Sequence, residues 1–293
     1  MTEHLTGARK RLVRADEQLI ALRTAVDSFV NDDPYTVLAE MDAEASGEFI
    51  LRAHVLKEPC LLEWGLIAGD VVHNLRSALD YVVWDLSVYE SGPVPEPIPD
   101  RSDWRRIEFP IFYDNSRYDG TPGGQGNVPR GSGPDKLWGV DKALHAEFRA
   151  LQPFDTGQLP NTQPLWVLQE LSNLDKHRAI PVVGLVVHTA FSAFPDLVGF
   201  PPLPPGFPPF EAEFFDLVGE GPFEHGANLG RMRLTGGLVI PIAAIPVQVD
   251  RSHAFDIAFD KGFPAYGGRV FDELKEMRRL VSAIIDRLAT EFS

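Results

Sequence analysis

Cysteine is nearly absent from this chain of 293 residues, in which Cys60 is the single example. One thiol cannot form an internal disulfide, and it cannot supply the repeated cysteines of a zinc-finger motif. Cys60 stands at the expected start of a helix, where we interpret it as a small buried hydrophobic side chain rather than a reactive thiol. The sequence therefore excludes an internal disulfide framework and a cysteine-based zinc site.

Long apolar runs and positive charge are also scarce. The first residues, MTEHLTGARKRLVRADEQ, are charged and lack the apolar core of a signal peptide, and no apolar run approaches the roughly 20 residues of a membrane helix. Asp and Glu number 42 against 27 Lys and Arg, for a net charge of −15. Such a surface repels a phosphate backbone, which disfavours nucleic acid as a partner. We expect a soluble cytoplasmic protein with no membrane partner.

Amphipathic helices dominate the remaining pattern. Residues 3–30 repeat apolar side chains at alternating spacings of three and four, which is typical of a helix that packs along its length. Proline stands at the start of two further helices, over 60–89 and 164–178. Residues 270–288 again present one apolar face. We therefore predict four long helices, of which the first and last pack near each other, and a shorter one over 140–151.

Strand-like segments lie between these helices. Residues 35–43 and 48–56 read as a hairpin, and 181–194, 236–249 and 253–260 read as further strands. This mixture predicts an α+β fold in which a bundle of about four long helices packs with a mainly antiparallel β-sheet.

We predict a single domain over 1–293 with loop-rich insertions around 91–139 and 195–235, where Pro and Gly are frequent. Within the first insertion, RIEFPIFYD (106–114) is expected to be an ordered extended segment.

The first polar motif, HNLRSALD, lies within the helix predicted over 60–89. His73, Arg76 and Asp80 stand at i, i+3 and i+7 and form one stripe, with Asn74 beside it. Lys and Glu, common on solvated faces, are missing from the sixteen residues GDVVHNLRSALDYVVW. We therefore expect another element to cover this stripe.

The second motif, SNLDKHR, closes the helix predicted over 164–178. Asp175 and Arg178 fall on its apolar side, where a charge needs a partner. A crossed pairing of Arg178 with Asp80 and of Asp175 with Arg76 would satisfy both helices. A second stripe on the same helix is formed by Glu170, Asn173 and His177.

Together the two motifs resemble those of a widespread group of uncharacterised bacterial and phage-encoded proteins. The resemblance rests on HNLRSALD, on a later helix ending in NxDKHR and on the apolar strand that follows, and it covers roughly residues 60–185. That group has no settled activity. The resemblance therefore implies that the two segments belong together, and it implies no reaction.

The cluster suits recognition of an anionic ligand or phosphoester chemistry. His73 and His177 would then act as general acid and base near neutral pH. Two arginines would hold the anion and two carboxylates would orient the other groups. These supporting residues are Arg76, Arg178, Asp80 and Asp175.

Other interpretations stay open. The cluster can be a structural ion-pair network in a non-catalytic scaffold or protein-binding module. An RNase of the HEPN type uses Arg and His on bundle helices, but its Arg-x4–6-His signature is missing here. His73, Asp80, Glu170 and His177 have the ligand types of a zinc or iron site without a compact motif. No Walker loop or GxSxG element occurs, and we expect no cofactor.

Overall fold

The computed structural model describes residues 4–45, 47–92, 94, 103–120, 128–187, 211–216, 220–222, 224–235, 244–247, 255–260 and 267–292. The chain divides into two compact units. Unit 1 comprises Met1–Leu22, Gly65–Pro181 and Phe259–Ser293, and unit 2 comprises Arg23–Trp64 and Val182–Ala258. The prediction that residues 1–293 form a single domain stays a prediction.

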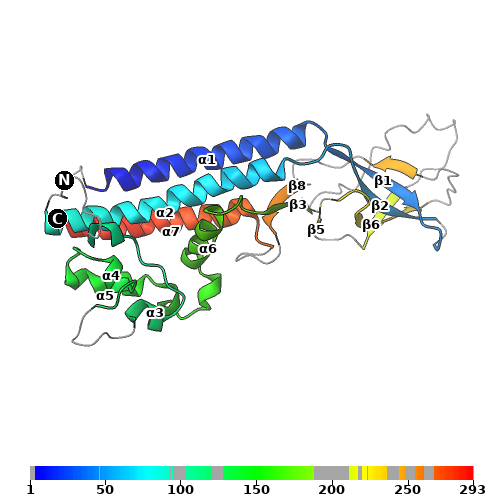
Figure 1. Cartoon of the computed structure of the whole chain (residues 1–293). Helices are drawn as coiled ribbons and strands as arrows, with labels where there is room; N and C mark the ends of the chain where they lie inside the picture. The colour runs from blue at the N-terminus through cyan, green and yellow to red at the C-terminus, as the bar shows by residue number, and fades with distance from the viewer. Residues whose placement is uncertain are drawn as a thin grey trace. The chain divides into compact units, whose positions relative to one another are not determined.

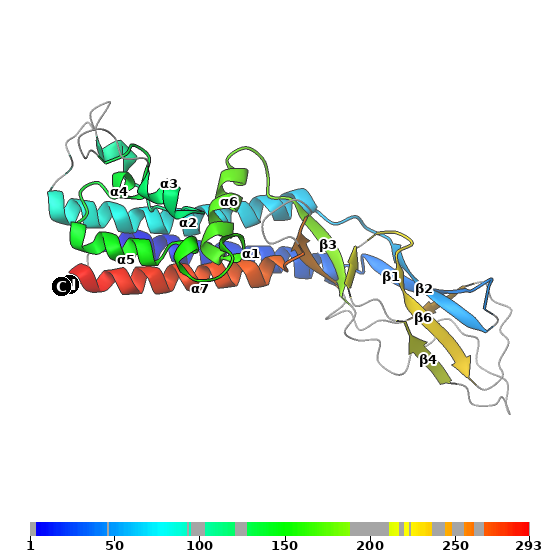
Figure 2. The same ribbon diagram turned by 90° about the horizontal axis from the view of Figure 1, so that it is seen from below.

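Unit 1 is built on three long helices that lie side by side in both ribbon views (Figures 1 and 2). They are α1 (Thr6–Asn31, whose last turns belong to unit 2), α2 (Leu61–Ser91) and α7 (Val270–Ala289). Arg278 of α7 donates two hydrogen bonds, of 2.8 and 2.7 Å, to the carboxylate of Asp16 in α1. The first and last helices therefore pack together, as the sequence predicts.

The apolar faces of these helices follow the sequence periodicity. Seven apolar residues that share one side of α2 have no exposed surface. They are Val71, Val72, Leu75, Ala78, Leu79, Val82 and Val83. Because side chains three and four apart share one face of a helix, this local pattern determines which face of α2 is buried.

Shorter elements complete unit 1, and of these α3, α4, α5 and α6 lie on the side of α2 and α7 away from α1 (Figure 1). The helices of four or more residues are η1 (Asp103–Arg106), α3 (Asn115–Asp119), α4 (Gly133–Lys136), α5 (His145–Ala150) and α6 (Pro164–Asp175). The three-residue turns are η3 (Lys142–Leu144), η4 (Pro153–Asp155), η5 (Pro160–Thr162) and η7 (Thr290–Phe292). Residues 107–112 are extended and pair with no strand in the described part of the chain.

Unit 2 carries the strands. A five-stranded sheet has the order β4-β6-β2-β1-β7, and a three-stranded sheet has the order β5-β3-β8. Every pairing with a described register is antiparallel. The bounds are β1 (Tyr35–Met41), β2 (Glu48–Val55), β3 (Val182–Val187), β4 (Glu211–Phe215), β5 (Glu220–Pro222), β6 (Asn228–Thr235), β7 (Ala244–Val247) and β8 (Phe255–Phe259).

The predicted hairpin is confirmed. Val37 lies opposite Ala53 and Ala39 lies opposite Leu51, and these four inward side chains are buried. The period of two along each strand places them on one face of the sheet. The α+β class and the mainly antiparallel sheet are therefore confirmed, and the longest helices are α1, α2 and α7, followed by the 12-residue α6.

Several details differ from the sequence analysis. The region 195–235 was expected to be loop-rich, and its described part contains β4, β5 and β6. Cys60 is exposed, because it precedes the first turn of α2 and does not lie on its buried face. The strands expected over 181–194 and 236–249 are described only as β3 and β7. The described helices include none with the length and apolarity that crossing a membrane requires.

Candidate functional site: the Arg76 cluster

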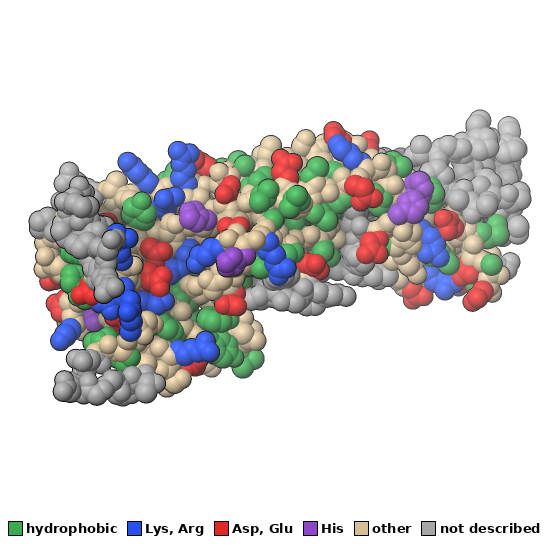
Figure 3. Space-filling model, viewed as in Figure 1, with side chains coloured by type: hydrophobic (Ala, Val, Ile, Leu, Met, Phe, Trp, Pro, Cys, Tyr) green, Lys and Arg blue, Asp and Glu red, His purple; other side chains and the backbone are tan. Residues whose placement is uncertain are grey.

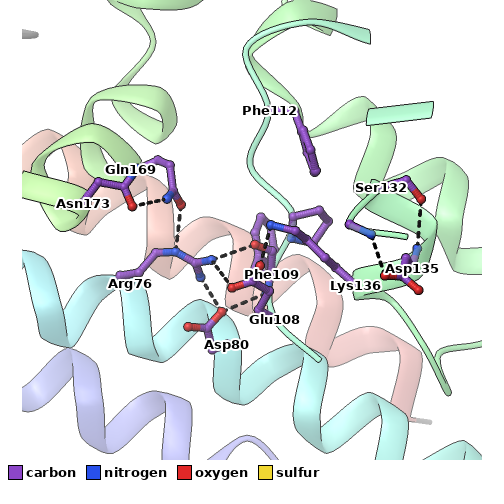
Figure 4. A network of polar contacts seen from close by, with 12 residues as sticks. Arg76, Asp80, Glu108, Phe109, Phe112, Ser132, Asp135, Lys136, Gln169 and Asn173 are labelled. Carbon is purple, nitrogen blue, oxygen red and sulfur yellow. Dashed lines mark hydrogen bonds and ion pairs between the residues drawn. The ribbon is translucent and has the colours of Figure 1, made fainter. Parts of the chain in front are cut away.

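Arg76 is the centre of a polar cluster on α2 (Figure 4). Its residue surface is 8% exposed, and all three of its guanidinium nitrogens donate to acceptors of the protein. Nε donates to Oε1 of Gln169 on α6 at 3.0 Å, and one terminal nitrogen pairs with the Asp80 carboxylate. The other terminal nitrogen donates to the backbone carbonyl of Phe109 at 2.9 Å and lies 3.8 Å from a carboxylate oxygen of Glu108.

The cluster holds the extended segment 107–112 against α2. Oδ1 of Asp80 accepts the backbone N–H of Phe109 at 2.8 Å, while Arg76 donates to the carbonyl of the same residue. The two side chains thus bind both backbone polar groups of one residue, as a neighbouring strand does in a hydrogen-bonded pair of a sheet. The Phe109 side chain is fully buried, so the clamp fixes a core residue in a segment without regular structure.

A second side chain continues this clamp along the segment. Gln152 is fully buried, and its Nε2 donates to the carbonyls of Pro110 at 2.8 Å and Phe148 at 2.9 Å. Its Oε1 accepts the backbone N–H of Phe112 at 3.0 Å. The segment therefore receives from α2 and from Gln152 the hydrogen bonds that a β-ladder would otherwise provide.

Burial dominates the electrostatics of the pair at the centre of the cluster. It raises the pKa of the Asp80 carboxyl above its usual value, against the opposing effects of Arg76 and of the Phe109 amide. Glu108 adds a small repulsion to Asp80, and Glu108 is itself paired with Lys136. A desolvation cost that exceeds the attraction of the partners is typical of ion pairs that contribute specificity more than stability.

Two glycines let the end of α6 and the chain beyond it approach α2 closely. A Cβ atom added to Gly65 would overlap the backbone carbonyl oxygen of Ile180, and one added to Gly69 would overlap the carboxylate of Asp175. Together with the bond between Arg76 and Gln169, these contacts show that the two sequence motifs meet. The prediction that the segments lie together is confirmed.

The crossed ion pairs predicted between the motifs are wrong. Arg76 pairs with Asp80 on its own helix and with Glu108, whereas Asp175 packs on Gly69. Within the described chain the contacts of Asp80 are with Arg76, the Phe109 amide and the Glu108 charge, and Arg178 is not among them. The cause is the end of α6 at Asp175, before Arg178. Arg178 is exposed instead of facing inward.

The helix α6 closes with a tightened turn after Asp175. Pro181 disfavours the helical conformation at Ile180, so the helix does not resume before β3. The backbone N–H groups of His177 and Arg178 both turn back to the carbonyl of Leu174, at 2.9 and 3.1 Å. The His177 bond spans three residues instead of the four of an α-helix, so the chain tightens after α6 and the regular helical spacing assumed through position 178 does not hold.

The two predicted catalytic histidines are both exposed. Nε2 of His73 lies 3.5 Å from the hydroxyl of Ser77, one turn further along α2. His177 lies beyond the end of α6. Neither imidazole is among the contacts of the buried cluster around Arg76.

The other predicted site residues contact neighbours on their own helix or on an adjacent one. Asn74 is buried, donates to the carbonyl of Asp70 at 2.8 Å and accepts from Arg11 of α1 at 3.1 Å. Asn173 is exposed and accepts from Gln169 at 3.0 Å. Burial raises the pKa of the Asp175 carboxyl, repulsion from Asp70 adds to the rise, and His73 opposes it.

The predicted metal alternative is not assembled. Nowhere in the described chain do three or more His, Cys, Asp or Glu side chains form a group that could hold a metal ion. His73, Asp80, Glu170 and His177 all belong to the described residues, so they form no such site. Asp80 instead accepts hydrogen bonds from the Arg76 guanidinium and from the backbone N–H of Phe109.

Sequence reasoning missed the partners that complete the cluster: Gln152, Gln169, Glu108 and the backbone of Phe109. The only signal for Gln169 was its position four residues before Asn173 on the same helix face. Gln152 is a lone amide at a loop, and nothing in its neighbours marks it as buried.

Comparisons of the chain with protein-family models, with curated proteins and with solved structures found no match.

Proposed function

We propose that this protein is a non-catalytic binding module in which the Arg76 cluster is a structural clamp. The observation that carries the proposal is the engagement of every guanidinium nitrogen of Arg76 by acceptors of the protein itself. An arginine that recognises a ligand anion needs donors that face the ligand. Arg76 is buried and its donors face Gln169, Asp80 and Phe109.

The positions of the histidines also favour a non-catalytic role. A general base needs a position within reach of the reacting proton and a group that orients it. His73 has a 3.5 Å contact with a hydroxyl and a charge interaction with Asp175, and both it and His177 lie at the surface. The two histidines and the buried Arg76 therefore do not form one enclosed site with a general acid, a general base and an anion-binding group.

Exposed apolar side chains on unit 1 favour a protein partner. Val13 and Ile20 are 56% and 66% exposed and stand two turns apart on one face of α1, and Leu66 of α2 is 53% exposed. Figure 3 shows hydrophobic side chains over the middle of α1 and α2, with charged side chains around them. An apolar centre with a polar rim is the usual composition of a protein-binding surface.

The binding arm of the test changes this surface without touching the core. A partner captured from cells and identified by mass spectrometry is purified, and its affinity is measured for the wild type and for the double variant Val13→Asp/Ile20→Asp. We expect a loss of affinity of at least about tenfold, because charged groups at the centre of an interface must be desolvated. Val128→Asp is the matched control, since Val128 is also 56% exposed.

The catalytic arm measures hydrolysis of generic phosphomonoesters and phosphodiesters by the wild type, His73→Ala and His177→Ala. We expect all three proteins to stay at the background rate. Hydrolysis by the wild type that falls at least about tenfold in either variant, with the melting temperature unchanged, would establish phosphoester chemistry and overturn the proposal.

A further inference from the structure

Two histidines of unit 2 meet outside the Arg76 cluster. The ring centroids of His54, on β2, and His225, in the turn before β6, are 4.5 Å apart, and the ring planes are inclined by 60°. His54 is half-buried and His225 is exposed. Figure 3 shows histidine side chains together at the surface of the strand region. The pair is thus reachable from solvent.

The backbone holds this pair in place. The turn that carries His225 is bound to β2 by hydrogen bonds from Gly226 N–H to the Ala53 carbonyl at 2.8 Å and from Ala53 N–H to the Ala227 carbonyl at 3.0 Å. The Arg52 side chain adds a third bond, of 3.0 Å, to the carbonyl of Gly226. Residues next to both imidazoles are therefore bonded to each other, which limits how far the rings can separate.

The spacing of the rings fits two ligands of one metal ion. Metal–nitrogen bonds of about 2.0–2.1 Å place the centroids of two cis imidazoles roughly 4.5–5.2 Å apart, for bond angles from about 90 to 109°. The observed centroid separation of 4.5 Å lies at the lower end of this range. That end corresponds to bond angles of about 90°, as in octahedral and tetragonal coordination. The 60° inclination also excludes parallel stacking of the two rings.

We propose that His54 and His225 form a surface site for a divalent transition-metal ion. Imidazole nitrogen is a ligand for copper, nickel and zinc, whereas magnesium and calcium require oxygen ligands. Among the described residues no third His, Cys, Asp or Glu joins the pair. Two or more coordination positions of the ion therefore remain for water or for a ligand outside the chain, which distinguishes the site from a closed structural zinc site.

The site goes beyond the binding role proposed above, and it does not depend on that role. Its affinity is expected to follow the order copper above nickel and zinc, with no binding of magnesium. The affinity falls as pH falls, because protons compete with the metal for the same nitrogen lone pairs.

The test titrates the full-length wild-type protein with Cu²⁺, Ni²⁺, Zn²⁺ and Mg²⁺, with binding followed by calorimetry and by NMR of the imidazole signals. The variants His54→Gln and His225→Gln each remove one ligand, and we expect each to weaken Ni²⁺ binding at this site by at least about tenfold. His73→Gln and His177→Gln, which change exposed histidines of unit 1, are the matched controls and should bind as the wild type does.

NMR signals that broaden or shift for His54 and His225 together, at one ion per chain, support the proposal. Unchanged Ni²⁺ affinity in His225→Gln overturns it. This variant remains decisive if His54→Gln fails to fold, because His225 is exposed in its turn. An equal loss of affinity in His73→Gln would show that surface histidines bind the ion without selectivity, and it would also overturn the proposal.

Discussion

Replacement of Arg76 by alanine is the sharpest test of the structural clamp. The change removes the partner of the Asp80 carboxylate, the donor to Gln169 and the donor to the Phe109 carbonyl. Breaking a buried ion pair costs about 3–5 kcal/mol of unfolding free energy. The Asp80 side chain is 38% exposed, so water can solvate it again and reduce the loss. We therefore expect Arg76→Ala to lose about 3 kcal/mol.

Urea unfolding followed by circular dichroism measures this loss. With a slope of about 2 kcal/mol per M, the midpoint should fall by about 1.5 M. Arg14→Ala is the matched control, because the side chain of Arg14 is 69% exposed and, among the described residues, its ion pair is with Glu17 on its own helix. We expect that control to change stability by less than about 0.5 kcal/mol.

A double variant separates a backbone clamp from a simple ion pair. An isolated buried pair can be replaced by apolar residues with little or no loss of stability. In Arg76→Met/Asp80→Leu, however, the N–H and the carbonyl of Phe109 would both lose their partners, at about 1–3 kcal/mol for each unsatisfied group. The double variant should therefore regain less than half of the stability lost in Arg76→Ala.

Hydrogen exchange at the Phe109 amide gives an independent measurement, since that N–H is bound to Asp80. It should exchange faster in the double variant than in the wild type. Full recovery of stability, or unchanged exchange at this amide, would refute the clamp.

Four further substitutions test the surroundings of the cluster. Gln152→Glu, which places carboxylate oxygen against two backbone carbonyls, should lower the unfolding free energy by about 2–4 kcal/mol in urea titrations at neutral pH. Gly65→Ala should lower the melting temperature more than Gly69→Ala does, because the first Cβ meets a backbone carbonyl and the second meets a side chain that can move. Folding raises the pKa of the Asp175 carboxyl. Its contribution to the free energy of unfolding is therefore complete below its pKa in the unfolded chain, and it is lost as pH rises through its pKa in the folded chain. Asp175→Asn should therefore be more stable than the wild type at pH 7, by roughly 0.5 kcal/mol or less, and this difference should vanish in unfolding titrations below the unfolded pKa.

Local periodicity accounts for the parts of this fold that the sequence predicts well. The apolar seam of α1 and the buried face of α2 follow from spacings within one helix, and the β1–β2 hairpin follows from alternation within two short segments. The choice of interaction partners does not follow from periodicity. Arg76 was predicted to pair with Asp175 across two helices, and it pairs with Asp80 and an extended segment instead.

The sequence by itself determined the class of fold and the helix faces that become buried, because side-chain spacing along one element is a local property. Only the tertiary structure decided what those polar groups contact. The end of α6 at Asp175 leaves Arg178 exposed, and residues 107–112 place beside α2 backbone groups that no neighbouring strand binds in the described chain. A buried backbone polar group requires a partner wherever it lies, and no sequence pattern indicates which distant side chain will provide it.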